Sequence, residues 1–576
     1  MVCLSLLRIE TTWNNADAIV SNTVVAMSII VFLIWIFKRT SLRLSSLDSI
    51  LISWYLYMIG YAYLQTEYPV SIIVLKSTLY LALYLALRVL FSAIRTNGDV
   101  IALGIAGLAI VEAVMGINQM INGTSRHYLY PMTGSFFNPN GFATLIGMGM
   151  VTTVSLWKKY AIGFEQYIDR ISKNDYIQKN KCLRRILKSV RKTHAEYVFY
   201  AILMLLMSIL MLTWCRAAII ATIVTLLYIY RAELNKYKWI IMLAIVVGSV
   251  LLYVMKQGSA DGRGIIWWVS SHIIAEHPLT GTGIGSFIHQ YGEQMVRLTG
   301  DMPDGSLQSA DVLGYSFNAL LHIGVEQGAV GILFAVCTIA IIAWYSHGNN
   351  SCYKWNIAVM LITSFFSYTF ELLQFQIIMV VVMAHLATEH YPDEEKNGSK
   401  RWSIMFWAIS LILSLLILPR IKKLVEMNED YARTVGFMNS YFIKDYYKML
   451  PYMLDNSTFL FNFAKALREE KRYNDSNDML RRGALVSNDP MYLVMQGNNY
   501  KDMDFAEEAD NMYNKAFRMM PNRIYPLYKL MLLYKDTRQN TKAKEMAERI
   551  TAFKVKVESP ATRDIKNEAN KLLHNE

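Results

Sequence analysis

The sequence predicts an all-α protein: a polytopic bundle of about twelve transmembrane helices with a large extracytoplasmic loop, followed by a C-terminal domain of helical repeats. Three observations support this fold class. Of the 576 residues, 54% are hydrophobic and only 18% are charged. Uncharged apolar runs recur along the first two thirds of the chain, many of them near the roughly 17–25 residues that cross a bilayer. The remaining residues are polar and show helical periodicity with a repeat length near 34.

The apolar runs are separated by polar connections. They cover residues 19–37, 50–64, 70–90, 100–120, 141–157, 197–212, 217–230, 239–255, 320–344, 355–368, 372–387 and 402–418. The longest polar interruption, residues 257–316, follows the eighth run and is the predicted large loop. We therefore assign residues 1–419 to a transmembrane domain that includes this loop, and residues 420–576 to a repeat domain.

The distribution of basic residues predicts the topology. Residues 158–195 carry eleven Lys or Arg residues against three acids, whereas residues 257–316 carry two against six. Because Lys and Arg are enriched in cytoplasmic loops, the first segment is expected in the cytoplasm and the second on the opposite face, together with residues 122–138, 213–216 and the C-terminal region. The net charge of +12 then reflects cytoplasmic loops rather than a nucleic-acid partner. Whether the basic segment also contacts anionic membrane lipids is left open.

The C-terminal region contains segments that resemble one another. Residues 456–490 and 491–521 each end at a proline, Pro490 or Pro521, and a weaker unit follows from residue 525. Small residues recur where paired helices would pack closely, as in tetratricopeptide repeats of 34 residues. A plain helical bundle is the alternative, and the recurring prolines favour repeats. Such an array would bind a protein partner or position the domain beside it.

Two arginines on the outer face form the main candidate binding site. Arg216 lies in TWCRAAIIA at the outer end of an apolar run, and Arg263 lies in GRGIIWW shortly after another run. Guanidinium groups bind phosphate through paired hydrogen bonds, so two of them on a face with few other cations predict an anion site, most naturally for pyrophosphate. The alternative for Arg216 is a side chain that extends to the membrane interface.

Two turns on the same face are rich in glycine or asparagine. The turn PLTGTGIGSF, residues 278–287, lacks the strand and helix of a dinucleotide-binding loop, so we expect it to pack tightly against the membrane surface. In TGSFFNPNGF, residues 133–142, Asn138 and Asn140 can cap the next helix, and amides there could also meet a sugar or phosphate. The five cysteines show neither metal-ligand nor disulfide spacing, so no metal site is predicted.

Four motifs occur in order between residues 112 and 331: GSFFNPNGFA, CRAAIIA, GRGIIWW with EHPLTGTGIGSF, and FNALLHIGVEQGAVG. Together they resemble the O-antigen ligase and polymerase superfamily of bacterial membrane glycosyltransferases, and the repeats resemble those of many members in Bacteroidetes-like bacteria. The resemblance implies an inner-membrane enzyme with its loop and repeats in the periplasm. The enzyme would move a glycan from undecaprenyl pyrophosphate to a lipid A-core, glycan or protein hydroxyl. It would need no metal or sugar nucleotide, and Arg216 and Arg263 would hold the donor pyrophosphate.

One departure from the family concerns the acceptor. Family ligases usually show a His-Asn pair where this chain has Phe317 and Asn318, and that histidine is thought to activate the acceptor hydroxyl. Because phenylalanine cannot take a proton, we consider Glu326 first, then His322 and Asp311 as substitutes. Glu326 and His322 lie four residues apart and would share a helix face, and a desolvated carboxylate can act as a base. The alternative for both is a buried, hydrogen-bonded structural role.

Several alternatives remain open. The same motifs would serve a polymerase that adds repeat units as well as a ligase that attaches a finished glycan. A polysaccharide transporter would instead show polar, helix-breaking residues near mid-membrane and internal repeat symmetry, and an assembly scaffold would need no arginine pair. The remaining candidates for substrate binding are Asn138, Asn140 and Asn318.

Overall fold

The computed structural model describes most of the chain. The described residues are 41–65, 67–94, 96–125, 127, 129–164, 192–237, 239, 257–299, 314–347, 351–390, 399–434, 440–555 and 558–574. The predicted span at residues 19–37 and all but the first residue of the span at 239–255 lie outside these ranges, and so do the candidate residue Asp311 and most of the basic segment. Within the described ranges every regular element is a helix, apart from one isolated antiparallel bridge between Leu42 and Ser399.

Each predicted apolar run that falls in the described ranges contains a helix, although the run at residues 355–368 is helical only as far as Ser364. They form α3 (Ser46–Leu64), α4 (Ser71–Ala93), α5 (Gly98–Asn122), α6 (Pro139–Tyr160), α10 (Lys192–Leu212), α11 (Arg216–Ile229), α16 (Ala319–His347), α17 (Lys354–Ser364), α18 (Leu373–Glu389) and α19 (Lys400–Thr434). Short elements flank some of them: α12 (Arg231–Leu234), η1 (Asn235–Tyr237) and η3 (Thr369–Glu371); two more, η6 (Ser440–Phe442) and η7 (Leu450–Tyr452), lie after α19.

Helix length and composition make the chain a multi-pass membrane protein. Among the described residues, five helices (α4, α5, α10, α16 and α19) are long and apolar enough to cross a membrane, and α11 and α18 are shorter apolar helices. The total of about twelve spans stays a prediction.

Local sequence signals set the helix ends. α3 begins with a capping box in which Ser45 and Asp48 each bond the other's backbone N–H. Asn138 caps α6, and Pro139 occupies the first turn, where a missing N–H removes no hydrogen bond. Of the two asparagines expected to cap this helix, only Asn138 does so, and Asn140 lies inside the first turn.

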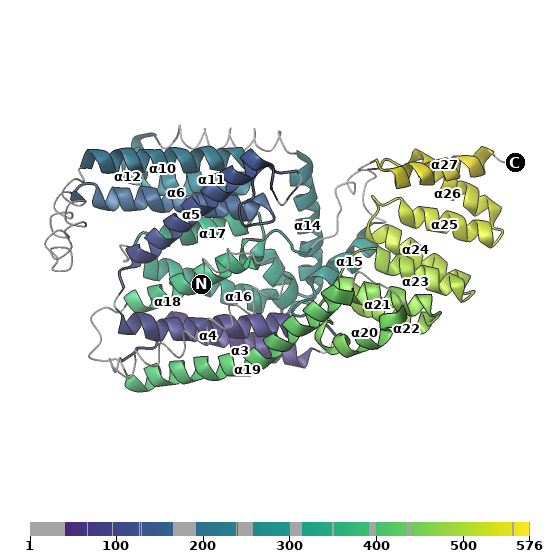
Figure 1. Ribbon diagram of the computed structural model, residues 1–576, viewed down its shortest axis with the longest axis horizontal. Helices are drawn as coiled ribbons and strands as arrows, with labels where there is room; N and C mark the ends of the chain where they lie inside the picture. Colours follow the sequence, from purple (N-terminus) through teal and green to yellow (C-terminus); the bar gives the residue numbers. More distant parts are fainter. Residues whose placement is uncertain are drawn as a thin grey trace.

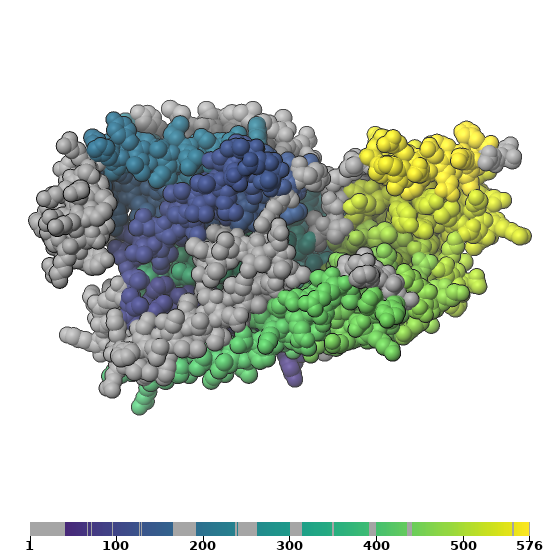
Figure 2. Space-filling model, in the orientation of Figure 1, coloured from purple at the N-terminus to yellow at the C-terminus, as the bar shows by residue number. Residues whose placement is uncertain are grey.

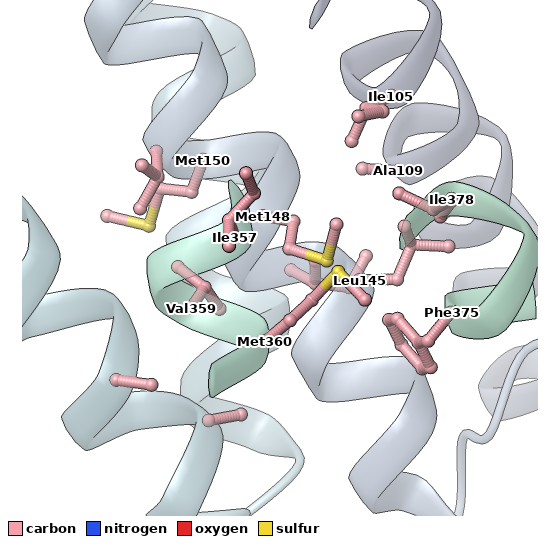
Figure 3. Close-up of a cluster of buried hydrophobic side chains, with 14 of the residues drawn as sticks. Ile105, Ala109, Leu145, Met148, Met150, Ile357, Val359, Met360, Phe375 and Ile378 are labelled. Carbon is pink, nitrogen blue, oxygen red and sulfur yellow. The ribbon is translucent and has the colours of Figure 1, made fainter. Parts of the chain in front are cut away.

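The centre of the bundle is a tightly packed apolar core (Figure 3). Leu145 of α6 lies there with Met360 of α17 and Phe375 of α18. The helix α5 approaches α6 so closely that a Cβ atom added to Gly149 would lie 2.2 Å from the Cβ of Ala109. Glycine on α6 is therefore required where the two helices meet.

The polar segment 257–316, which the sequence predicted to be a loop, contains two helices. These are α14 (Gln257–Glu276) and α15 (Phe287–Leu298). The apolar residues of α15 repeat with a helical period rather than in a continuous run, and Phe287, Tyr291 and Met295 are buried. Both helices lie at the end of the bundle that faces the C-terminal part (Figure 1).

Helical hairpins stack to form the C-terminal part (Figure 1). After α20 (Ile443–Met449) come α21 (Ser457–Glu469), α22 (Tyr473–Ala484), α23 (Met491–Asp502), α24 (Ala506–Met519), α25 (Tyr525–Asp536), α26 (Asn540–Ala552) and α27 (Pro560–His574). The first helices of three hairpins begin at residues 457, 491 and 525, so each begins 34 residues after the one before. This period agrees with the predicted repeat length, and the assignment to tetratricopeptide repeats stays a prediction.

The helix α19 joins the two parts of the molecule. Its residues Ile417, Ile421 and Leu424 pack in a core with α4, and Met427 and Tyr431 pack with the first hairpin. The predicted domain boundary after residue 419 therefore falls inside one continuous helix of 35 residues. Figure 2 shows the repeats as a mass at one end of the bundle, with α19 running into it.

Candidate functional site

A small pocket brings together four of the predicted site residues. Its volume is about 90 Å³, and it lies where the start of α6, the turn before α11 and the helix α14 meet. Its lining residues are Tyr130, Asn138, Pro139, Asn140, Thr213, Trp214, Cys215, Arg216, Ala217 and Arg263. Asn138, Asn140, Arg216 and Arg263 come from three separate sequence motifs, and the fold makes them neighbours.

Buried polar side chains of α5 hold the turn that precedes Asn138. The Gln119 Oε1 atom accepts the N–H groups of Thr133 at 3.0 Å and Gly134 at 2.8 Å, and Glu112 Oε2 accepts the N–H of Ser135 at 2.8 Å. Gly134 has a φ of +58°, and a Cβ atom there would lie 2.0 Å from Glu112 Oε2. The glycine of this motif is therefore needed for both the backbone conformation and the close approach to α5.

The turn before α11 places Arg216 at the pocket. Thr213 Oγ1 accepts the N–H of Cys215 at 3.3 Å, and the thiol of Cys215 donates to Asn140 Oδ1 at 2.7 Å. Trp214 between them has a φ of +52°, a conformation that bulky residues rarely adopt. Arg216 is the first residue of α11, so its side chain lies beside N–H groups that a helix N-terminus leaves without an intrahelical acceptor.

Arg263 reaches the same pocket from α14. Its burial, and then the positive charge of Arg216, lower the pKa of its guanidinium, although an arginine stays charged at neutral pH. Two half-buried guanidinium groups near one another repel, and a bound anion would relieve this repulsion. The snorkelling alternative for Arg216 does not explain why a second cation approaches it.

Phe317, which stands where the family's histidine is expected, packs against Arg263. The Cζ atom of Arg263 lies 5.7 Å from the centroid of the Phe317 ring, within the range of a cation–π contact. The ring also lies edge-on to Tyr368, at 5.6 Å between centroids, and Tyr315 stacks on Tyr368 at 5.3 Å. Phe317 therefore supports one of the two arginines and supplies no proton-accepting group.

Tyr368 connects this aromatic cluster to the asparagine turn. Its hydroxyl shares a hydrogen bond with the Asn138 side chain. Sequence reasoning missed Tyr368 because it lies at the end of an apolar run, where tyrosine is also common as an interfacial residue. No motif distinguishes it.

The glycine-rich turn packs into a break in α16. The helix is kinked at Gly328, with φ of 60° and ψ of −153°. On one side of the kink Ala329 N–H donates to Pro278 O at 2.8 Å, and on the other Thr282 N–H donates to Val325 O at 2.8 Å. A Cβ atom on Gly328 would lie 2.5 Å from the carbonyl carbon of Leu279. The backbone of α16 and the backbone of the turn are therefore in direct contact here.

Glu326 and His322 lie beside this break and do not line the arginine pocket. The Glu326 carboxylate accepts the backbone N–H groups of Gly285 and Phe287. Its Oε1 atom lies 3.5 Å from His322 Nε2, so the two side chains share a helix face as predicted. Asn318 is a helix cap, since its Oδ1 accepts the N–H of Leu320 at 3.0 Å. Asp311 lies outside the described residues.

One further carboxylate lies near these groups. Glu371 is an exposed residue at the end of η3, three residues after Tyr368. It is close enough for its charge to act on both Tyr315 and Glu326. Sequence reasoning did not consider it, because it lies in the short connection between two apolar runs. In the part of the chain that the structure describes, no three His, Cys, Asp or Glu side chains are grouped to hold a metal ion.

These features define a class: a multi-pass helical membrane protein with an arginine-lined pocket near one end of its bundle and a helical array beside it. Residues 199–336 match the family model Wzy_C, described as O-antigen ligase. The match runs from α10 into α16 and includes Arg216, Arg263 and Glu326. It supports the resemblance seen in the motifs and a ligase-like or polymerase-like function. No curated protein and no solved structure matches the chain.

Proposed function

We propose that the protein is a membrane glycosyltransferase that moves a glycan from undecaprenyl pyrophosphate to a hydroxyl of lipid A-core, another glycan or a protein. The observation that carries the proposal is the convergence of Arg216 and Arg263 on one pocket. A pyrophosphate can bind two guanidinium groups through paired hydrogen bonds. The match to O-antigen ligases over residues 199–336 supports the same class of donor. The reaction would take place on the periplasmic side of the inner membrane.

The proposed reaction is a single displacement that inverts the anomeric carbon. The acceptor hydroxyl oxygen forms a bond to C1 of the first sugar as the bond from C1 to the phosphate oxygen breaks. The leaving undecaprenyl pyrophosphate keeps the electron pair of that bond, and a protein base takes the hydroxyl proton. Arg216 and Arg263 would stabilise the charge that grows on the leaving oxygen, a role that contributes strongly to catalysis in many enzymes.

For the base we propose Glu326, with His322 as the second candidate and Asp311 as the third. Glu326 lies 3.5 Å from His322, so a proton that the carboxylate accepts can be shared with the imidazole. The arginine pocket and Glu326 are linked through Phe317, Tyr368, Tyr315 and Glu371, each in contact or in electrostatic reach of the next. The acceptor would approach along these residues, between the arginine pocket and Glu326.

Arginine substitutions test the donor site. We expect Arg216→Ala and Arg263→Ala each to lower transfer by roughly a hundredfold or more, because each removes a preorganised charge that acts on the leaving group. The measurement is release of undecaprenyl pyrophosphate by the purified protein with a lipid-linked glycan and an acceptor. Arg297→Ala is the control, since this exposed arginine of α15 pairs with Glu276 outside the pocket. Full transfer by the Arg216→Ala, Arg263→Ala double variant would rule the mechanism out.

A polymerase of the same superfamily is the alternative within this chemistry. The helical array favours a ligase slightly, since it could recruit a protein or lipid acceptor. A deletion strain separates the two: short surface chains indicate a polymerase, and undecorated acceptor with accumulated lipid-linked glycan indicates a ligase.

A further inference from the structure

Trp214 is an exposed aromatic residue in the wall of the arginine pocket. Its side chain is 57% exposed, although the residues on either side, Thr213 and Cys215, are buried. It is two residues from Arg216, and both residues line the pocket. An indole ring in this place adds an apolar surface to a pocket that is otherwise mostly polar.

In the membrane part of the molecule, the non-glycine residues with strained backbone conformations lie next to the two pocket arginines. Among the described residues, the non-glycine positions with positive φ are Trp214, Phe317, Lys471, Asp504 and Arg538. The last three occupy equivalent turns of the helical hairpins. Trp214 and Phe317 lie beside Arg216 and Arg263 respectively, and strained residues of this kind tend to occur at functional sites.

Packing within the protein explains Phe317 but not Trp214. The ring of Phe317 contacts Arg263 and Tyr368. For Trp214, the backbone N–H donates to Met211 O at 3.2 Å, and within the described part of the chain its indole makes neither a hydrogen bond nor a ring contact. The turn is already held by Thr213 and Cys215, so the tryptophan side chain is not needed to form it.

We propose that the indole of Trp214 is the binding platform for the first sugar of the donor, the sugar bonded directly to the distal phosphate. This inference rests on the proposed function. A sugar ring presents an apolar face of C–H groups that can stack on an aromatic ring, and the indole N–H can donate to a hydroxyl. Because the phosphate and the sugar are directly bonded, a phosphate on Arg216 brings the sugar to a side chain two residues away in the same wall. The platform would orient C1 toward the acceptor.

The alternative role for an exposed tryptophan is to anchor the helix end at the membrane interface. An anchor affects every ligand equally, whereas a sugar platform distinguishes a lipid pyrophosphate that carries a sugar from one that does not. This difference defines the experiment.

The experiment measures binding of two ligands to the full chain in lipid nanodiscs: undecaprenyl pyrophosphate, and the same lipid carrying its glycan. We expect Trp214→Ala to weaken binding of the glycan-bearing lipid by about two- to tenfold and to leave binding of the bare lipid unchanged. Trp214→Phe, which keeps an aromatic face, should retain most of the difference. Trp344→Ala is the matched control, because Trp344 is 60% exposed and lies toward the other end of α16.

Equal effects of Trp214→Ala on both ligands, or no effect on either, would overturn the platform, and so would the same selective loss in Trp344→Ala. Failure of the proposed function has a different signature: the Arg216→Ala, Arg263→Ala double variant would then bind bare undecaprenyl pyrophosphate as tightly as the unmodified protein. Failure of the Trp214 proposal and failure of the proposed function can therefore be distinguished, because they are measured with different variants and different ligands.

Discussion

The carboxylate of Glu326 accepts two backbone N–H groups from the glycine-rich turn and lies 3.5 Å from His322. These contacts hold the turn against α16, a structural role that any good acceptor can fill. The proposed role as a base needs a group that takes a proton. The two roles can therefore be separated by replacing the carboxylate with groups that keep or remove the acceptor.

Glu326→Gln should keep the turn in place but remove the group that accepts the proton. Glutamine retains a carbonyl oxygen for the N–H groups of Gly285 and Phe287, so the unfolding temperature should change little. Transfer should fall by roughly a hundredfold or more, the usual contribution of a general base. Release of undecaprenyl pyrophosphate and thermal unfolding of the purified protein measure the two effects.

Glu326→Ala is the comparison, because it leaves two N–H groups without an acceptor and should destabilise the protein by about 1–3 kcal/mol. If Glu326→Gln transfers glycan at the original rate, Glu326 has only the structural role and the base is another group.

The predictability of the site differs from residue to residue. Arg216, Arg263 and Asn138 could be proposed from the sequence, because each lies at or near the end of an apolar run on the face predicted to be extracytoplasmic, where two arginines suggest an anion site. Trp214 and Tyr368 could not, since aromatic residues at helix ends are also typical of membrane interfaces. The position of Tyr368 and the proposed role of Trp214 depend on backbone conformation and on contacts between segments far apart in sequence, which spacing does not reveal.

Among the elements, the break in α16 organises the end of the bundle that faces the C-terminal part. The turn at residues 278–286 supplies hydrogen bonds to backbone groups on both sides of Gly328, so the kink leaves few polar groups without partners. Non-helical backbone at membrane depth is stable only when it is covered in this way. Sequence reasoning predicted a tight glycine-enabled turn but not its partner, because the apolar period of α16 continues through the kink.

Gly328→Ala should disrupt this docking. Alanine is disfavoured at a φ of +60°, and its Cβ atom would lie 2.5 Å from the backbone of Leu279. The strained backbone alone destabilises by about 1–3 kcal/mol, so we expect a clearly lower unfolding temperature and loss of glycan transfer. Gly107→Ala is the matched control: no atom lies within 4 Å of the added Cβ, and alanine favours a helix over glycine by roughly 0.5–1 kcal/mol. Equal stability of the two variants would contradict the docking.

At the scale of the whole molecule, the repeats are attached to the membrane part at several separate places. α19 runs through the cores of both parts. α15 contacts α24 through an ion pair of 2.8 Å between Glu293 and Lys515, and His289 Nδ1 donates to Ala484 O at 2.9 Å. Since α15 directly follows the turn that docks into α16, the position of the repeats is connected to the position of that turn. Periodicity predicted the hairpins but not this docking, which joins residues about two hundred positions apart.

Asp455 lies at the junction between the repeats and the membrane part, and its carboxyl should make the stability of this junction depend on pH. It precedes the first hairpin, and its Oδ2 atom accepts the N–H of Ile72 at the start of α4 at 3.2 Å. Its Oδ1 atom is buried and has no hydrogen-bond partner among the described residues. Burial raises the pKa of this carboxyl to about 6, while the Ile72 N–H and Arg420 act in the opposite direction. In an unfolded chain the pKa of an aspartate is about 3.9.

A group whose pKa is raised by folding stabilises the folded protein most below its unfolded value, and this contribution is lost as the pH rises through the folded value. The junction should therefore be most stable below about pH 4 and lose on the order of 2 kcal/mol as the pH passes 6. Asp455→Asn, which cannot ionise, should flatten the dependence of the unfolding temperature on pH between about 4.5 and 7.5. Asp564→Asn, at an exposed acid of α27, is the control and should leave the slope unchanged. A slope in Asp455→Asn equal to that of the unmodified chain would mean that other groups set the pH response of the junction.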